Sequence, residues 1–208
     1  MDALDYEYDV FISYRHHEWK PWVRECFMPS FRRWLRALKD DAKVFFDEDV
    51  IPEDVIQGGS NWVPKLATGL AKSRILVPLL SRQYFGTDWC LAEYKHMQGR
   101  ERGFTKPESR RAKSLIVPAV IHDGEHFPSD VLAMKPVYLK KFISYAQNGK
   151  KKEELEQCIK TSLVPNVIQA IRGAPKFDPE WEHRAIDDFE KVQVTATKQN
   201  IPPSLGES

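Results

Sequence analysis

Trp89 and Glu93 are the pair of side chains whose types and spacing point most directly to chemistry. They stand in the stretch T-D-W-C-L-A-E-Y-K-H-M (residues 87–97), shortly after the apolar run R-I-L-V-P-L-L-S (residues 74–81). Residues four apart in a helix share a face, so an aromatic plane and a carboxylate would be presented together near a helix start. Spacing alone favours a core tryptophan and a solvated surface acid. The surrounding elements therefore have to decide between the two interpretations.

Short β-rich runs alternate with helix-like segments along the chain. The runs are Tyr8–Ser13, Lys43–Asp47, Ile75–Ser81, Leu115–Ile121 and, more weakly, Val137–Leu139. Their continuously apolar character indicates strands covered on both faces, as in parallel sheets. Helices are predicted over residues 19–38, 61–72, 88–98 and 153–171, with Pro29 and Pro165 expected to bend or break them. The order predicts an open, doubly wound α/β sheet.

Polar residues follow the ends of four of these runs. They read S-Y-R-H-H, D-E-D, S-R-Q and H-D-G-E-H. In open α/β sheets, ligands gather beyond the carboxyl ends of the strands, so one edge should collect the chemistry. Asp123-Gly124 is a strong turn signal, which favours a solvated turn over a metal cluster at H-D-G-E-H. His16 can reach a substrate there, but its neighbour His17 cannot easily face the same site.

Several function classes lack their signatures. The chain has no G-x-G-x-x-G, no G-x-x-x-x-G-K-[ST] and no G-x-S-x-G, which argues against Rossmann, P-loop and ordinary serine-hydrolase sites. Cys26, Cys90 and Cys158 are single and widely spaced, so neither a disulfide framework nor a zinc knuckle is expected. The net charge of +1 offers no field for nucleic acid.

The 208 residues suffice for one domain with an appendage. No apolar run approaches the length of a membrane span, and the acidic start M-D-A-L-D does not resemble a secretory signal, so we expect a cytoplasmic protein without a membrane partner. Beyond Gly173 the sequence is richer in proline and polar residues, which predicts an aromatic anchor followed by a frayed end.

Five motifs, in this order, resemble those of a TIR (Toll/interleukin-1 receptor) domain. They are D-V-F-I-S-Y-R (residues 9–15), V-F-F-D-E-D-V-I-P (44–52), G-S-N-W (59–62), S-R-I-L-V-P-L-L-S (73–81) and D-W-C-L-A-E (88–93). The resemblance covers about residues 6–172 and implies a flavodoxin-like, five-stranded parallel sheet with helices on both faces. Residues 173–208 would form a partly disordered C-terminal extension.

The resemblance also implies site residues. In the enzymatic branch of the family, the glutamate of W-x-x-x-E is catalytic, and Glu93 matches it. The enzyme cleaves NAD⁺ into nicotinamide and an ADP-ribose product, without a metal or other cofactor. By the same resemblance, the substrate-binding positions are Trp89, Ser13, Tyr14, Arg15, His16 and Asp47. His16 stands where some family members have a second arginine.

A single carboxylate suits this chemistry. Most glycosidases use two carboxyl groups, because an alkoxide leaving group must be protonated. In NAD⁺ the nicotinamide is a cationic pyridinium that departs neutral, so no general acid is required. Glu93 could then stabilise the developing oxocarbenium charge and bind ribose hydroxyls, while Trp89 stacks on the nicotinamide.

Two functions remain open at this point. The first is an NAD⁺ nucleosidase, either hydrolase or cyclase, that acts as an assembly-activated effector or signal producer in prokaryotic antiviral immunity. The second is a non-catalytic adaptor that signals through TIR–TIR contacts. Both imply homotypic association and a separate activator or downstream effector. The loop over residues 48–61 carries a five-residue insertion, E-D-V-I-Q, and in the family this loop docks on a neighbouring TIR domain.

Overall fold

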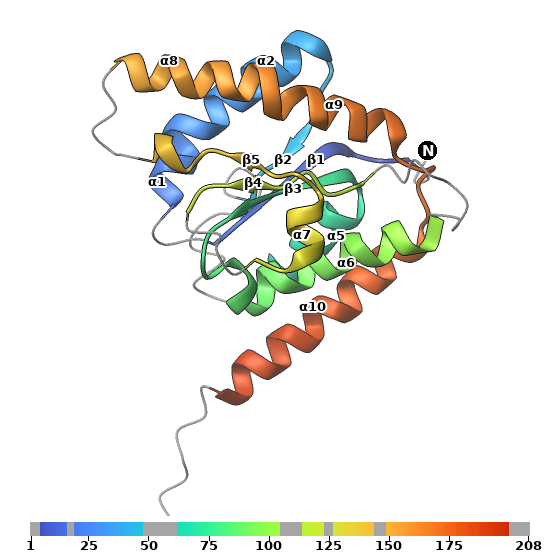
Figure 1. The fold of residues 1–208 in the computed structure, drawn as a ribbon. Helices are drawn as coiled ribbons and strands as arrows, with labels where there is room; N and C mark the ends of the chain where they lie inside the picture. The colour runs from blue at the N-terminus through green and yellow to red at the C-terminus, as the bar shows by residue number, and fades with distance from the viewer. Residues whose placement is uncertain are drawn as a thin grey trace, which may run out of the picture.

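The computed structural model describes residues 5–15, 19–47, 62–104, 114–122, 127–143 and 149–199. Within these ranges, five parallel strands form one sheet in the order β2-β1-β3-β4-β5 (Figure 1). The strands are β1 (Tyr8–Tyr14), β2 (Val44–Phe45), β3 (Ser73–Leu80), β4 (Ala119–Val120) and β5 (Val137–Tyr138). The prediction of a parallel, doubly wound sheet is confirmed.

The two long strands β1 and β3 form the centre of the sheet. They pair from Tyr8 opposite Ser73 to Tyr14 opposite Leu79. The outer strands β2, β4 and β5 are two residues each, shorter than their apolar runs predict. The run before β4 joins β3 through a single bridge between Leu76 and Ile116. Apolar composition therefore located every strand but overestimated the length of three, because buried residues beside a strand are equally apolar.

Helices cover both faces of the sheet. One face carries α1 (Lys20–Trp22), α2 (Met28–Leu38), α8 (Gly149–Cys158) and α9 (Val164–Gly173), and the other carries α5 (Trp62–Ala71), α6 (Asp88–Phe104), α7 (Ser129–Ala133) and α10 (Glu180–Gln199) (Figure 1). Short 3₁₀ turns lie at Tyr84–Gly86 and Lys140–Phe142. None of the helices in the described ranges is long and apolar enough to cross a membrane.

Pro29 and Pro165 do not end their helices. Each follows a π-helical segment, Val23–Phe27 and Ile159–Leu163 respectively. The amide of Met28 donates to the carbonyl of Val23, five residues back, and Val164 donates to Ile159 in the same way. A proline has no amide hydrogen and its ring collides with the carbonyl four residues before it. The wider π turn relieves that collision, so each helix continues past its proline.

The sequence predicts a frayed end over residues 194–208, but helix α10 extends to Gln199, so the first six of these residues are helical. Trp181, Ala185 and Phe189 recur every four residues and are buried against α5 and α6. The buried guanidinium of Arg100 donates to the carbonyl of Ser73 at 2.9 Å and lies 4.1 Å from the Trp181 ring centroid. Aromatic packing and a cation–π contact thus fix the helix to the sheet domain. Residues 200–208 lie outside the described part, and the boundary at 172/173 stays a prediction.

Alternation along β1 decides which side chains can meet. Val10, Ile12 and Tyr14 pack into the core beneath α2 and α9, while Phe11 packs toward α5 and α6. Successive side chains of a strand point to opposite faces. Ser13 therefore faces α6, and Tyr14 faces away from it.

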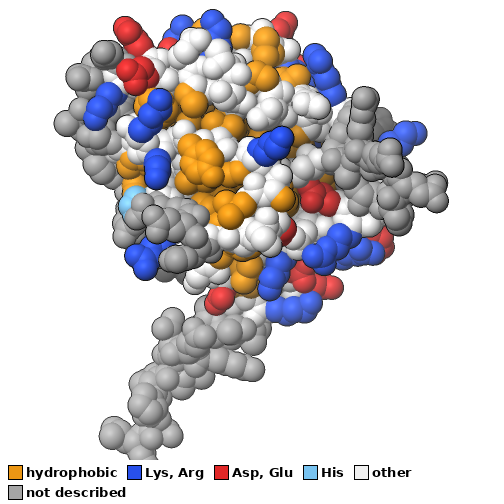
Figure 2. Space-filling view, viewed as in Figure 1, with side chains coloured by type: hydrophobic (Ala, Val, Ile, Leu, Met, Phe, Trp, Pro, Cys, Tyr) orange, Lys and Arg blue, Asp and Glu red, His pale blue; other side chains and the backbone are white. Residues whose placement is uncertain are grey.

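Two large apolar side chains are exposed near the β5 edge of the sheet. Tyr138 on β5 and Leu132 on α7 are 53% and 43% exposed. Figure 2 shows apolar side chains across the middle of this face, with Lys and Arg side chains around them. Lys140 and Lys141 follow β5 after one intervening residue, Leu139. Such flanking charge discourages indiscriminate pairing with an exposed strand edge.

Candidate active site

Glu93 is buried, with 6% of its surface exposed, at the carboxyl edge of the sheet. Cys90, Glu93 and Met97 lie on the buried face of α6, because residues three, four and seven apart share one side of a helix. The hydroxyl of Ser13, near the end of β1, donates a hydrogen bond to Oε2 of Glu93. The structure thus brings together two of the predicted site residues from positions 80 residues apart. A solvated surface acid, the alternative for Glu93, is ruled out by its burial.

Tyr84 joins this pair although the sequence analysis did not single it out. Its hydroxyl lies 2.6 Å from Oγ of Ser13, and the whole side chain is buried. It comes from the 3₁₀ turn between β3 and α6. Burial raises the pKa of Tyr84 well above its usual value, so the hydroxyl keeps its proton. A buried tyrosine hydroxyl usually has a hydrogen-bond partner. This general rule is the one signal by which the sequence could have indicated a polar contact at Tyr84.

Charged groups from two further loops lie around Cys90. Burial raises the pKa of the Cys90 thiol well above its ordinary value, and the negative charges of Glu93 and Asp47 add to the effect. Arg15, following β1, acts in the opposite direction. Asp47, Arg15 and Glu93 therefore share one electrostatic environment at the carboxyl edge. Cys90 stays a neutral thiol there, which makes it unsuitable as a nucleophile.

Two buried polar atoms at the same edge have no hydrogen-bond partner among the described residues. They are Nη1 of Arg15, after β1, and Oγ of Ser81, after β3. Buried polar groups in proteins are nearly always paired, so each such atom calls for an explanation. A polar ligand that binds at the carboxyl edge would supply the partners.

Tyr14 is not brought to Glu93. Its ring is buried on the opposite face of the sheet and stacks on Phe46, with ring centroids 5.9 Å apart. The alternation of β1 enforces this, since Ser13 already faces α6. Only the backbone of Tyr14 shares the edge with the other predicted residues.

Trp89 lies one turn before Glu93 on α6 and is half-buried. Its ring centroid is 4.7 Å from that of Trp62 on α5 and 5.7 Å from that of Phe189 on α10. The indole therefore takes part in the packing of three helices. Its stacking on a substrate ring stays a prediction.

Several predicted features lie outside the described residues. These are His16, the loop over residues 48–61 and the D-G-E-H part of the turn at 123–126. His122 is described, and its ring lies 5.1 Å from that of Trp19. Among the residues that the structure describes, no group of three or more His, Cys, Asp or Glu side chains could hold a metal ion.

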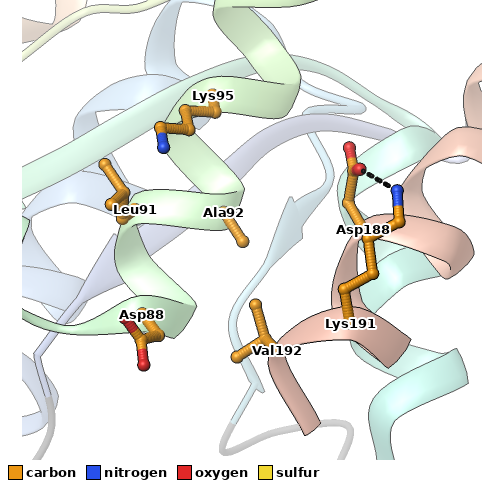
Figure 3. Close-up of a pocket in the computed structure, with 7 residues that line it drawn as sticks. All are labelled: Asp88, Leu91, Ala92, Lys95, Asp188, Lys191 and Val192. Atoms are coloured by element: carbon orange, nitrogen blue, oxygen red, sulfur yellow. Dashed lines mark hydrogen bonds and ion pairs between the residues drawn. The ribbon is translucent and has the colours of Figure 1, made fainter. Parts of the chain in front are cut away.

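A separate hollow of about 310 Å³ lies between α6 and α10 (Figure 3). Its lining residues are Asp88, Leu91, Ala92, Lys95, Asp188, Lys191 and Val192. Lys191 pairs with Asp188 at 3.4 Å within α10. None of the predicted site residues lines this hollow, which opens on a different side of α6 from the buried carboxylate of Glu93.

The sequence model of the TIR domain family matches residues 10–159. The chain belongs to the TIR domain family. The NAD(+) hydrolase TcpA of Theionarchaea archaeon (strain DG-70-1) is 29% identical over 136 residues, and the disease resistance protein RML1B of Arabidopsis thaliana is 24% identical over 205 residues.

These alignments cover only part of each relative. The match spans 60% of this chain and 37% of the archaeal hydrolase, and 98% of this chain and 17% of the plant protein. The TIR fold of the chain is therefore established, whereas the activities of the two longer relatives belong to those proteins.

Proposed function

We propose that this TIR domain cleaves the nicotinamide–ribose bond of NAD⁺. The observation that carries the proposal is the buried carboxylate of Glu93, held by the Ser13 hydroxyl at the carboxyl edge of the sheet. Surface acids are solvated and free to move, whereas this one is fixed in a low-dielectric setting where a developing positive charge is stabilised strongly. The 29% identity to an NAD(+) hydrolase also supports the proposal.

The roles follow from the chemistry of the substrate. Nicotinamide leaves as a neutral molecule, so the positive charge passes to the ribose ring, and the Glu93 carboxylate would stabilise it. The guanidinium of Arg15 has an unpaired buried nitrogen and could donate to the pyrophosphate. Water or an internal nucleophile would then capture the ribosyl cation, which gives hydrolysis or cyclisation respectively.

Control by assembly is a further part of the proposal. Val50, Ile51, Val55 and Ile56 in the 48–61 loop offer apolar contacts for a second copy of the chain, with acidic residues between them. Activity would then rise with protein concentration or with an added activator. We also propose a role in immunity, which the name of the plant relative, a disease resistance protein, supports. That this role is antiviral and belongs to a prokaryotic host is a proposal from the family resemblance alone.

The direct test is incubation of concentrated protein with NAD⁺, with the products resolved by chromatography and mass spectrometry. We expect nicotinamide release, and the second product tells hydrolysis from cyclisation. Glu93→Gln keeps the shape but removes the charge, so turnover should fall by on the order of 10² to 10³ while the melting curve changes little.

Glu101→Gln on the same helix is the matched control. The Glu101 carboxylate accepts from Ser114 and from the Leu115 amide, and a glutamine oxygen can still accept. This variant should retain wild-type turnover. If Glu93→Gln is as active as Glu101→Gln, Glu93 is not catalytic. If wild-type protein self-associates but releases no nicotinamide at any concentration, the chain is a non-catalytic adaptor.

A further inference from the structure

Three elements meet in one buried chain of hydroxyl and carboxyl groups. Tyr84 from the turn after β3 approaches Ser13 of β1 at 2.6 Å, and Ser13 in turn contacts Glu93 of α6. All three side chains are buried, with exposures of 0%, 2% and 6%. This series of hydrogen-bonded groups therefore runs from Tyr84 in the core outward to the carboxylate of Glu93.

The direction of the hydrogen bonds follows from proton counting. Ser13 has one hydroxyl proton, and it is donated to Oε2 of Glu93. Oγ of Ser13 can then only accept from the Tyr84 hydroxyl. Burial raises the pKa of Tyr84, which keeps that donor protonated. The sequence of donation is Tyr84 to Ser13 to Glu93.

The position of the Tyr84 hydroxyl is itself fixed. The backbone amide of Tyr84 donates to the carbonyl of Ser81 at 3.0 Å, at the end of β3. The next residue, Phe85, packs edge-on against Tyr94 and against Phe127. A hydroxyl held on a rigid turn can orient a freely rotating serine hydroxyl, whereas one on a mobile loop could not.

We propose that Tyr84 is a positioning residue for the reaction, acting through Ser13 to fix and keep ionised the carboxylate of Glu93. This inference rests on the proposed function. Without the tyrosine hydroxyl, the serine proton can turn to other acceptors, and Glu93 loses both its orientation and part of the stabilisation of its charge. The simpler role for Tyr84, a core ring with its hydroxyl merely satisfied, predicts no effect on the carboxylate.

Tyr84→Phe removes only the hydroxyl and tests the proposal. Tyr84 is fully buried, so the proposal gives it no contact with substrate. On that basis kcat should fall about fivefold or more with KM nearly unchanged. Hydrogen bonds to a carboxylate favour its charged form, so their loss raises the pKa of Glu93. The acid limb of the pH–kcat profile should therefore move to higher pH.

A double-variant cycle separates action through Ser13 from a general structural effect. If Tyr84 acts through Ser13, Tyr84→Phe has no further effect in a Ser13→Ala background. Tyr94→Phe is the matched control, since the Tyr94 hydroxyl points to Asp130 on α7, to whose carboxylate it donates at 3.4 Å. That control should leave kcat and the acid limb unchanged. Full additivity of the two variants would overturn the inference.

Carbon-13 NMR titration of the Glu93 carboxyl gives a measurement that does not depend on turnover. Wild type, Tyr84→Phe and Ser13→Ala are compared, and both variants should titrate at higher pH than wild type. An unchanged titration in Tyr84→Phe overturns the inference. If wild type releases no nicotinamide, the proposed function fails, and the NMR comparison alone decides whether Tyr84 controls the carboxylate.

Discussion

Single residues at the carboxyl edge differ in what their neighbours allow them to do. Glu93 and Ser13 are fixed by hydrogen bonding, and Arg15 keeps an unpaired buried nitrogen. Tyr14, one residue from Ser13, packs on the far face of the sheet. Adjacent residues of one motif therefore lie on opposite faces of the sheet. The effect expected of a substitution depends on the face to which the side chain points.

Arg15→Ala provides a test of substrate contact at the residue scale. If the guanidinium binds the pyrophosphate of NAD⁺, the variant should lose about tenfold or more in kcat/KM for NAD⁺, since charge-assisted hydrogen bonds are the strong ones. Nicotinamide riboside has the same scissile bond but no phosphate, so its kcat/KM should hardly change. An equal loss for both substrates would mean that Arg15 acts on the bond itself or on Glu93.

Sequence reasoning reached these residues to different degrees. Ser13, Asp47 and Glu93 could be placed at one edge, because strand ends of a parallel sheet meet there. The side of the sheet on which Tyr14 lies followed from a period of two, but only once β1 was located. Tyr84 could not be assigned, since its partner Ser13 is 71 residues away and a tyrosine after a strand carries no spacing signal of its own.

At the scale of elements, packing of helix on sheet explains what composition did not. Helix α10 was missed because proline and polar residues dominate its surroundings, although Trp181, Ala185 and Phe189 recur at helical spacing. Trp89 contacts Phe189 from this helix, which no local pattern could predict. The sequence likewise did not predict the π-helical segments before Pro29 and Pro165. They form because packing against the core keeps each helix continuous past its proline.

Gly69 marks the closest approach of α5 to the sheet. A Cβ added there would collide with the ring of Phe45 on β2, whereas a Cβ at Gly99 on α6 would meet open space. Gly69→Ala should therefore destabilise the protein by about 1–3 kcal/mol through overpacking. Gly99→Ala should stabilise it by about 0.5–1 kcal/mol, because alanine is the better helix former.

Urea unfolding followed by circular dichroism measures both glycine variants under the same conditions. Opposite signs would confirm that contact with Phe45, and not helix propensity, governs α5. If Gly69→Ala is as stable as Gly99→Ala, the ring of Phe45 has room to move and the two elements pack more loosely than the structure indicates.

At the scale of the whole molecule, helix α10 packs against α5 and α6, and this helical layer joins it to the domain that carries the site. His96 of α6 is buried in this layer, and Nε2 has no hydrogen-bond partner among the described residues. Burial, together with smaller contributions from the positive charges of Arg100 and Arg184, lowers the pKa of His96 from 6.5 to about 3. The folded protein therefore holds this imidazole neutral.

The consequence is an acid-sensitive fold. At pH above 6.5 the imidazole is neutral in both states and makes no difference to the free energy of unfolding. As the pH falls from 6.5 toward about 3, the unfolded chain binds a proton that the folded protein does not, so stability is lost. The loss attributable to His96 can reach about 1.4 kcal/mol per pH unit in this window.

His96→Gln, similar in size and without a titrating group, should unfold with a shallower dependence on pH. The variant His183→Gln, at an exposed histidine, serves as control for removal of an imidazole. Chemical unfolding of the three proteins at pH 7.5, 5.5 and 4.5 makes the comparison. If His96→Gln loses as much stability as wild type between pH 7.5 and 4.5, the imidazole is accessible to protons in the folded state, and the layer beneath α10 is not closed to water.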